Sequence, residues 1–382
     1  MNAIPSPPLR LALLADFLQE RWPSMDLCAE MLLEGLEARA GRVRPTLLRA
    51  PFAGRFGRLP LVGRTRAAWN ADRLMGRFLD YPRWVRTWEA EFALFHVVDH
   101  SYAALLLALP PGRGGVYCHD LDAVRCLIEP HRDPRPGWFR AMARRILQGM
   151  QRAGLVFHST QAVRAELLAH GLVEPARLVH APLGAAPEML PRGDLRAAEV
   201  APGLAGRPFV LHVGSTIPRK RIDVLLRAFA GARASAPGLV LVQVGGTWTS
   251  SQRRLLEDLG LEEEVVLQLR GVARADLAAL YRECRAVLLP SEAEGFGLPL
   301  LEALACGAAA LASDLPVLRE VGGDAASYVR PGQAQEWVEA LRGALLGADD
   351  RSARQARVAR AASFSWDLHA ERILEAYERL VG

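Results

Sequence analysis

Apolar residues in the second half of the chain form short continuous runs that alternate with longer amphipathic segments. The continuous runs lie in FVLHVG (209–214), GLVLVQVGG (238–246), EEVVLQLRG (263–271), AVLLP (286–290) and AAALAS (308–313). The amphipathic segments between and after them have helical periodicity and lie at 221–234, 250–260, 275–285, 297–307 and 336–346. Continuous apolar strands separated by helices are typical of a parallel sheet that is covered on both faces.

The first half repeats this alternation with a less regular spacing. Its apolar runs lie at 9–16, 44–50, 92–99, 114–120, 153–160 and 176–182, and a helix is expected to begin at Asp26. The two halves therefore predict an α/β protein with two doubly wound Rossmann-like domains, at 1–185 and 206–364, that face a central cleft. Residues 186–205, rich in Pro, Gly and Ala, are the predicted linker. The amphipathic helix 365–382 is expected to pack back on the first domain.

Composition supports a folded globular protein. Of the 382 residues, 51% are hydrophobic and 23% are charged, which is enough to build two ordinary cores. No apolar run approaches the roughly 20 residues that span a bilayer, and the stretch before Asp16 is too short for a cleavable signal, so a cytoplasmic protein is expected. The five cysteines form no C-x-x-C pair, which favours buried apolar side chains over a metal site.

The chain has a net positive charge, and all but one of its basic residues are arginine. The net charge of +5 fits anionic partners such as phosphates or acidic lipid surfaces but is too small to indicate nucleic acid. Of the 47 basic residues, Lys220 is the only lysine. An ammonium and a guanidinium differ in shape and hydration, so this position is a candidate for a role that arginine cannot take.

Two loops follow predicted strands at the end where parallel sheets bind ligands. The first, VGSTIPRKR (213–221), leaves its strand at Gly214 and brings Arg219 and Lys220 to the predicted start of a helix. Backbone amides and the helix dipole favour an anion there, and two cations add charge-assisted hydrogen bonds. The alternative is a solvated basic helix start.

The second loop, SEAEGFG (291–297), precedes an apolar helix that begins near Pro299 and contains Glu302. Its glycines allow the backbone to approach a ligand closely. A carboxylate at Glu302 can accept hydrogen bonds from both hydroxyls of a ribose, and Glu294 can accept those of a sugar beyond the phosphates. The alternative is that both acids, like Glu292, are exposed surface residues.

These segments resemble the donor-binding half of family 4 glycosyltransferases, which are retaining, metal-independent enzymes of the GT-B fold. The resemblance runs from about Pro208 to the end of the chain and rests on FVLHVGSTIPRKRIDVLLRAF, on the E-x7-E motif with its Gly and Phe, and on the terminal FSW. It implies a hexosyltransferase that uses a nucleotide diphosphate sugar, with no cofactor and no metal. The Pro-Arg-Lys form of the loop resembles mannosyltransferases, which favours GDP-mannose, with UDP-glucose as the alternative.

The resemblance also implies roles for individual residues. Arg219 and Lys220 would hold the diphosphate, Glu302 the ribose and Glu294 the transferred sugar. Further contacts with the donor are implied for Gly214 and Ser215 after the first strand, Gly271 and Val272 beside the base, Phe296, Gly297 and Leu298 along the sugar and phosphates, and His119 of YCHDLDAV near the sugar.

The chain departs from the family pattern at two positions. Many relatives have a glycine-rich loop after the first strand, whereas residues 16–26 of this chain read DFLQERWPSMD, which leaves Ser24 as the alternative phosphate contact. Ser215 stands where many relatives have an arginine, so Arg219 and Lys220 are expected to neutralise more of the diphosphate charge.

The chemistry implied is displacement of a nucleoside diphosphate by an acceptor hydroxyl on the same face of the sugar, with the leaving phosphate taking the proton. No pair of carboxylates at hydrolase spacing and no covalent nucleophile are evident. Two alternatives stay open, a nucleotide-sugar epimerase and a non-catalytic nucleotide-binding protein. A phosphorylase is disfavoured because its pyridoxal cofactor needs a lysine, and Lys220 is already assigned.

The sequence indicates less clearly which residues bind the acceptor. Residues 49–86 contain nine arginines and only two acids, Asp72 and Asp80, interleaved with aromatic residues that include Phe56, Trp69, Phe78, Tyr81 and Trp84. This mixture fits an anionic membrane surface or a glycan or lipid-linked acceptor. The alternative is a solvated insert packed on the domain. Residues 96–105 are expected to line the acceptor cleft, with His100 either there or in a structural role.

Overall fold

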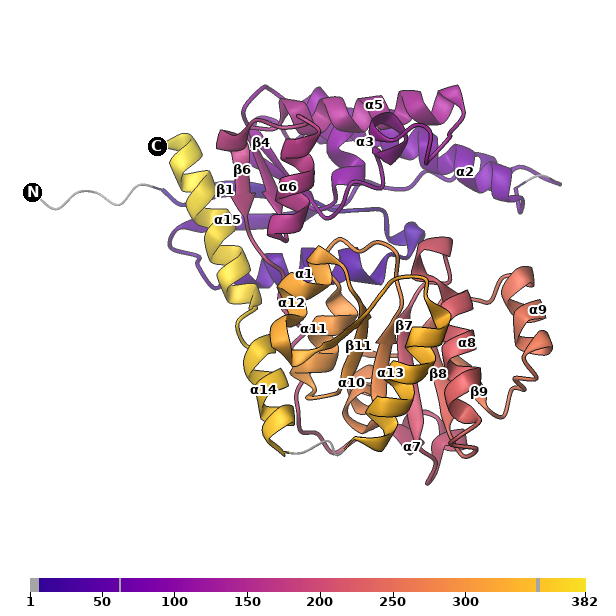
Figure 1. The fold of residues 1–382 in the computed structure, drawn as a ribbon. Coiled ribbons are helices and arrows are strands. Elements are labelled where there is room, and N and C mark those ends of the chain that lie inside the picture. The colour runs from indigo at the N-terminus through magenta and orange to yellow at the C-terminus, as the bar shows by residue number, and fades with distance from the viewer. Residues whose placement is uncertain (1–6, 62, 348–350) are drawn as a thin grey trace, which may run out of the picture. The chain divides into compact units, whose positions relative to one another are not determined.

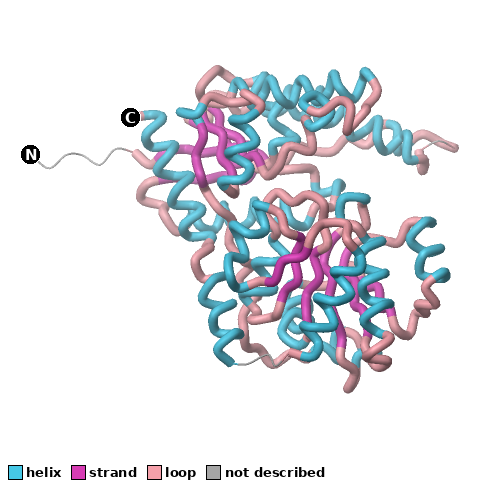
Figure 2. Tube along the Cα trace, in the orientation of Figure 1, coloured by secondary structure: helices cyan, strands magenta, loops and turns pink. Residues whose placement is uncertain are grey.

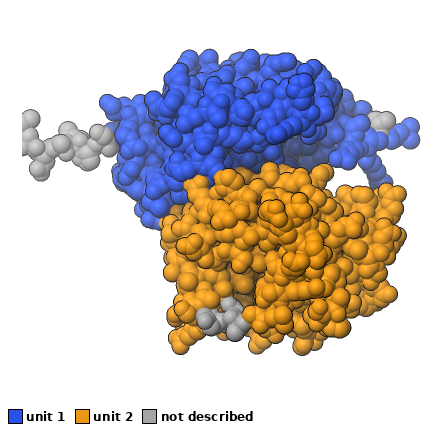
Figure 3. Space-filling model, viewed as in Figure 1, with its two compact units in different colours: residues 1–183, 366–382 blue, residues 184–365 orange. Residues whose placement is uncertain are grey.

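The computed structural model describes residues 7–61, 63–347 and 351–382, and they form two compact units (Figures 1 and 2). The first unit comprises residues 1–183 and 366–382, and the second comprises residues 184–365 (Figure 3). Residues 186–205, where a linker was predicted, belong to the second unit and contain a short helix, α7 (Ala197–Val200). No helix in the described part of the chain is long and apolar enough to cross a bilayer.

The first unit is built on a six-stranded parallel sheet with the order β2-β1-β3-β4-β5-β6. Its strands are β1 (Leu9–Leu14), β2 (Val43–Leu48), β3 (Leu94–Val97), β4 (Gly114–Cys118), β5 (Leu155–His158) and β6 (Leu178–His180). Its helices are α1 (Pro23–Glu37), α2 (Arg66–Met75), α3 (Tyr81–Arg86), α4 (Arg125–Ile128), α5 (Gly137–Arg152), α6 (Gln161–Ala169) and α15 (Trp366–Val381). The direction of strand succession reverses between β1 and β3, which makes this the switch point of the sheet.

The second unit has a six-stranded parallel sheet of the order β12-β11-β10-β7-β8-β9. Its strands are β7 (Phe209–Gly214), β8 (Val240–Gly245), β9 (Val266–Leu269), β10 (Ala286–Leu289), β11 (Ala310–Ser313) and β12 (Ser327–Val329). Its other helices are α8 (Ile222–Arg233), α9 (Ser250–Asp258), α10 (Arg274–Glu283), α11 (Leu298–Ala305), α12 (Pro316–Gly322), α13 (Ala334–Leu346) and α14 (Arg351–Ala361). Here the switch point lies between β7 and β10.

Both sheets are buried on both faces, as continuous apolar strands require. Every residue of β3, β4, β5, β10 and β11 is buried. The central strands β1 and β7 each have four consecutive buried residues. The doubly wound α/β prediction is confirmed for each unit, because each has a parallel sheet whose central strands are buried between helices.

The end of the chain belongs to the first unit, where α15 packs on α1. Arg39 and Arg42, in the turn that follows α1, bind Glu371 of α15 at 2.5 and 2.6 Å. Inside the unit, the Tyr377 hydroxyl is hydrogen-bonded to His96 Nδ1 at 2.9 Å. Gly35 of α1 lies so close to α15 that a Cβ there would approach Ala370 Cβ to 2.6 Å. The last helix is therefore part of the core of the first unit.

The arginine- and aromatic-rich segment 49–86 folds as helices rather than as an open insert. A turn at Phe56–Arg58 precedes α2, which continues through a π-helical turn into α3. Tyr81 is fully buried, and Phe78 and Trp84 pack against the core of the unit. Two of the arginines, Arg73 and Arg77, bind Glu20 at 2.8 and 2.6 Å. Most of the aromatic surface of this segment is therefore used in folding.

Two helical glycines give a matched test of packing in the two units. A Cβ on Gly149 of α5 would lie 2.0 Å from the carbonyl oxygen of Ala103, whereas nothing lies within 4 Å of one on Gly343 of α13. We expect Gly149→Ala to destabilise the protein by about 1–3 kcal/mol through overpacking. The control, Gly343→Ala, is expected to stabilise it by up to about 1 kcal/mol because alanine favours the helix. Urea unfolding measures both, and equal effects would contradict the packing.

Candidate functional site

The loop after β7 carries the two adjacent cations in a tight turn. Pro218–Lys220 form a 3-10 turn, and α8 begins only at Ile222, after Arg221 in the left-handed conformation (φ 47°). Arg219 and Lys220 therefore lie before the helix and not in its first turn, where the sequence placed them. Arg221 binds Asp223 and Glu292 at 2.7 and 2.5 Å, which holds the unusual backbone of this residue in place.

Lys220 forms a buried ion pair with Glu294 across the switch point of the sheet. The Lys220 Nζ lies 2.6 Å from Glu294 Oε1, and the lysine and glutamate side chains are only 11% and 6% exposed. Ser291 donates a second hydrogen bond to the same oxygen at 2.7 Å. Burial disfavours the ionised carboxyl, but Lys220, Ser291 and Arg219 outweigh it, so the pKa of Glu294 is below its usual value. The structure brings together the two residues that the sequence assigned to diphosphate and sugar.

Further contacts join the same two loops. Arg219 donates to the Ala293 carbonyl at 3.0 Å, and its own carbonyl accepts from the Glu292 amide at 2.8 Å. The loops follow β7 and β10, which are adjacent strands at the switch point. Ligands of doubly wound sheets bind at this position, so the arrangement is that of a binding site.

Helix α11 begins at the end of the acidic loop. Gly297 caps it with φ 90°, and a side chain there would also approach Leu318 Cδ2 to 2.5 Å, so only glycine fits. Leu298 is the first residue of the helix, and its amide faces outward from the helix start, whereas Pro299 has no N–H and the Leu300 and Leu301 amides donate to the Gly297 carbonyl. The Phe296 ring points away into the unit and packs edge-on against Phe364 at 5.7 Å. Only the backbone of Phe296 and Gly297 is therefore available to a ligand.

Glu302 is a buried acid rather than an exposed helix residue. Its side chain accepts a hydrogen bond from the Tyr281 hydroxyl of α10 at 2.9 Å, and the residue is only 7% exposed. Burial raises the pKa of Glu302 to about 7, against the opposing effects of Tyr281 and Arg274, and the carboxylate of Glu188 raises it further. Glu302 is therefore half-ionised near neutrality, whereas Glu294 is fully ionised.

Sequence reasoning missed four residues that interact with these acids: Ser291 and Tyr281 through hydrogen bonds, Glu188 and His212 through their charge. Tyr281 and Ser291 hold the two glutamates, and Glu188 comes from the segment predicted as a linker. His212 of β7 lies beneath Gly214 and has its pKa lowered to about 4 by burial. Only Ser291 carried a signal, because it directly follows a predicted strand; the others read as core or linker positions.

The remaining predicted donor contacts of this unit lie in loops that follow β7 and β9, at the carboxyl end of the same sheet. Ser215 is exposed after Gly214, whose carbonyl accepts from Gln243 at 2.9 Å. Gly271 is exposed with φ 63° in the loop after β9, and Val272 is half-buried. Among the described residues, no three His, Cys, Asp or Glu side chains gather as metal ligands.

His119 lies at the corresponding edge of the sheet in the first unit, directly after β4. Its Nε2 is hydrogen-bonded to the Val98 carbonyl at 2.9 Å, so in the neutral ring Nδ1 is the acceptor. Burial lowers its pKa, which keeps the ring neutral. Ser24 lies in the first turn of α1 and is exposed. His119 and Ser24 stay predicted donor contacts.

An acidic cluster that the sequence did not predict occupies the switch point of the first unit. Asp16 follows β1 and Asp99 follows β3, and both are buried. Burial and the Asp99 carboxylate raise the pKa of Asp16 well above its usual value. Burial opposes ionisation of Asp99, but His100, 3.2 Å away, lowers its pKa below the usual range. Neither oxygen of Asp16 accepts a hydrogen bond from an N–H or hydroxyl of the described residues.

Solved structures of similar fold cover nearly the whole chain. Sucrose-phosphate synthase from Thermosynechococcus elongatus superposes with a TM-score of 0.74 at 19% identity, covering 98% of this chain and 99% of that one. The Anabaena protein HepE, solved with UDP and glucose, superposes with a TM-score of 0.74 at 16% identity, covering 97% and 100% of the two chains. The chain has the GT-B fold.

Sequence similarity concentrates in the second GT-B domain. Residues 199–362 match the family model described as glycosyl transferases group 1, a region that contains both glutamates and the basic pair. A D-inositol 3-phosphate glycosyltransferase of Nocardia farcinica is 40% identical over 198 residues, which cover 48% of this chain and 44% of that protein. The chain spans about half the length of the curated relatives it matches.

The raised pKa of Glu302 makes the stability of this GT-B protein depend on pH. With a pKa of about 7 folded and about 4.5 unfolded, the stabilisation from the protonated carboxyl is complete below pH 4.5. Between these values the unfolded state releases its proton first, so stability falls as pH rises, by about 3 kcal/mol in total. Glutamine mimics the protonated acid, so Glu302→Gln is expected to lack this loss.

Urea unfolding of wild type and Glu302→Gln at several pH values between 4.5 and 8 measures this difference. The exposed Glu263→Gln, in the same domain, is the control and should follow wild type at every pH. Parallel curves for wild type and Glu302→Gln would contradict a buried, protonated carboxyl.

Proposed function

We propose that the protein is a glycosyltransferase that moves a hexose from a nucleotide diphosphate sugar to an acceptor hydroxyl. The observation that carries this proposal is the Lys220–Glu294 pair at the switch point, with Glu302 at the fifth residue of α11. The pair supplies a cation for a phosphate and an anion for sugar hydroxyls at adjacent positions. The group 1 family match and the similarity to inositol 3-phosphate glycosyltransferases support the same reaction class.

Different residues are proposed to bind different parts of the donor. Arg219, Lys220 and the Leu298 amide at the start of α11 bind the diphosphate, where charge develops as the glycosidic bond breaks. Glu294 accepts hydrogen bonds from the sugar, and Glu302 accepts those of the ribose diol. Phe296, Gly297 and Leu298 contribute backbone groups along the sugar and phosphates, Ser215 and Gly214 border the phosphates, and Gly271 and Val272 border the base. His119 offers a neutral imidazole to the sugar.

The proposed mechanism is retaining and needs no metal, as in the family 4 enzymes that the motifs resemble. The bond between the anomeric carbon and the phosphate oxygen breaks, and the electron pair stays on the nucleoside diphosphate. The acceptor oxygen bonds to the anomeric carbon from the same face. Its proton passes to the departing phosphate, which is the nearest base on that face. Arg219 and Lys220 supply the positive charge that a metal would otherwise provide.

The donor is proposed to be GDP-mannose or UDP-glucose. The Pro-Arg-Lys loop favours the first, and the similarity to HepE, solved with UDP and glucose, supports the second. The acceptor is a hydroxyl of a glycan or a lipid-linked molecule, and the similarity to inositol 3-phosphate glycosyltransferases adds a phosphorylated polyol. Asp16 offers such an acceptor two hydrogen-bonding oxygens at the switch point of the first unit. The protein is proposed to act in the cytoplasm, with a peripheral contact on anionic membrane through residues 49–86.

A thermal-shift panel of UDP, GDP, UDP-glucose and GDP-mannose tests donor binding. We expect one nucleotide and its sugar to stabilise the protein, and we expect Glu302→Ala to weaken that nucleotide's affinity in calorimetry. Donor incubated alone distinguishes the alternatives, since an epimerase yields an isomerised sugar and a non-catalytic protein yields nothing even with acceptors present. Unchanged affinity in Glu302→Ala would remove the ribose assignment.

Lys220→Ala is expected to reduce kcat/KM about 10- to 150-fold. This range corresponds to the roughly 1.5–3 kcal/mol of one hydrogen bond to a charged group. Turnover of the donor by wild type, Lys220→Ala and Lys220→Arg measures the effect and shows whether charge alone is enough. Arg227→Ala, an exposed residue of α8, is the control. Wild-type turnover in Lys220→Ala would overturn the assignment.

The single lysine also provides a direct probe of binding. Protein labelled with 15N-lysine contains one Nζ, that of Lys220. We expect its signal to shift on addition of the stabilising nucleoside diphosphate and not on addition of the nucleoside. A signal that responds to neither would place the diphosphate elsewhere.

A further inference from the structure

A loop of the first unit presents leucines to solvent in a way that a folded protein ordinarily avoids. Leu59 is 47% exposed and Leu61 is 102% exposed, with the exposed Pro60 between them. Leu61 also has a left-handed backbone (φ 69°), which is unfavourable for a residue with a branched side chain. Exposed apolar side chains contribute nothing to folding and the left-handed backbone costs stability, so this loop is a candidate for a function outside the fold.

The loop is held in a defined shape. Buried Asp72 of α2 accepts hydrogen bonds from the Phe56 and Gly57 amides at 2.9 and 2.8 Å. The Gly63 amide closes the loop by donating to the Leu59 carbonyl at 2.9 Å. A Cβ on Gly63 would lie 2.4 Å from the Gly57 carbonyl oxygen, so the two arms approach as closely as the backbone permits. The exposed leucines are thus presented by a closed, anchored loop.

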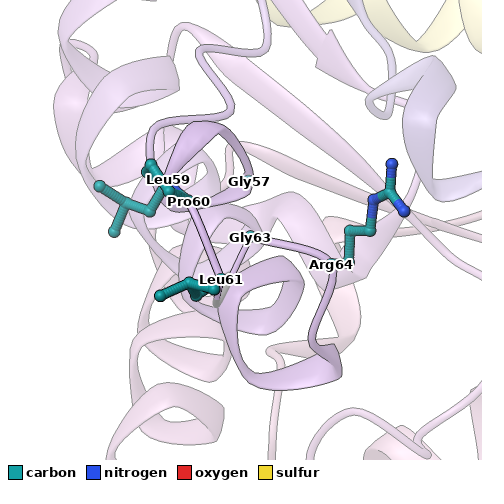
Figure 4. A pocket seen from close by; sticks show the side chains of 6 residues that line it. All are labelled: Gly57, Leu59, Pro60, Leu61, Gly63 and Arg64. Atoms are coloured by element: carbon teal, nitrogen blue, oxygen red, sulfur yellow. The ribbon is translucent and has the colours of Figure 1, made fainter.

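The charges around the leucines have one sign. Arg58, Arg64 and Arg66 are exposed beside them, and residues 49–71 contain no acid. Figure 4 shows the side chains of Leu59 and Leu61 on one side of the loop and that of Arg64 extending to the other. Exposed leucines at the tip of the loop, with exposed arginines close in sequence, match the chemistry of a bilayer surface, in which acyl chains lie beneath anionic headgroups.

The rest of segment 49–86 offers less to a membrane. Phe52, Phe78, Tyr81 and Trp84 are part of the core or packed against it, Trp69 contacts Phe52, and Arg55, Arg73 and Arg77 pair with acids. A second copy of the chain would also present arginines at this tip, so like charges disfavour self-association through it. The surface that remains is the tip itself.

We propose that this tip, Leu59, Pro60 and Leu61 with Arg58, Arg64 and Arg66, inserts into the headgroup region of an anionic bilayer. The inference rests on the peripheral contact in the proposed function and assigns that contact to one loop. The leucines enter the acyl boundary, and the three arginines bind lipid phosphates. Each arginine near the surface contributes about a fivefold gain in partitioning.

Sedimentation with vesicles of phosphatidylcholine and 30% phosphatidylglycerol tests the proposal, with pure phosphatidylcholine as the comparison lipid. We expect wild type to bind the anionic vesicles, to bind the neutral ones at least tenfold more weakly, and to be released by 0.5 M salt. The double variant Arg58→Gln, Arg64→Gln is expected to bind the anionic vesicles about 25-fold more weakly.

Leu61→Gly separates insertion from folding. Glycine relieves the left-handed strain, so the variant should unfold at the same temperature as wild type or higher, and yet it should lose most of its vesicle binding. The control is Leu346→Asn, which changes a leucine that is 89% exposed at the end of α13. It should bind vesicles like wild type.

The outcomes distinguish the two proposals. If wild type binds anionic vesicles and Leu61→Gly binds equally well, this loop is not the contact, although the peripheral contact stands. If wild type does not bind, both fail, whereas donor binding in the thermal-shift panel is unaffected. If light scattering shows a wild-type dimer that Leu61→Gly converts to a monomer, the tip binds a second copy of the chain and the proposal is overturned.

Discussion

The ion pair between Lys220 and Glu294 is the interaction on which the second unit's site depends. It joins the loops of two adjacent strands that are distant in sequence, and it satisfies two buried charges that would each be costly alone. Breaking it would leave a carboxylate buried beside Ser291 and a lysine beneath Gly214. In the proposed reaction, a donor would insert its phosphate and sugar hydroxyls between these groups, so the unliganded pair keeps both side chains oriented. An arginine at 220 would have to fit a larger planar group into the same buried space.

Two glutamates eight positions apart are in different protonation states because their neighbours differ. Glu294 has an ammonium and a hydroxyl within 2.7 Å, so it stays ionised despite burial. Glu302 has a phenol and a second carboxylate, Glu188, so burial dominates and its pKa rises. Ribose hydroxyls would donate to an ionised Glu302, so nucleotide binding and proton release are coupled at this residue. The same motif therefore combines a permanent charge with a titrating one.

The sequence predicted the doubly wound sheets because apolar strands buried on both faces leave an unambiguous pattern, and the structure confirms them. Gly297 and Pro299 likewise predicted the start of α11, since a cap and a first-turn proline act locally. The supporting residues were not predictable: Tyr281 lies on the apolar face of α10 and reads as core, and Glu188 reads as linker. Asp16 reads as the end of a strand, and only the reversal between β1 and β3 brings it to Asp99. The roles of the site residues toward a ligand stay predictions. They depend on side chains that are far apart in the chain and that the sequence alone does not bring together.

The placement of α15 has a consequence for how the protein is made. Its Tyr377 lies against His96 in the first unit, yet the ribosome adds it after every residue of the second unit. During synthesis the core of the first unit stays incomplete, and the face of α1 around Gly35 stays uncovered until α15 has been made. The second unit, continuous from 184 to 365, faces no such delay and can fold while its partner is incomplete. The nascent chain therefore exposes apolar surface in its first unit, and residues 366–382 cover that surface.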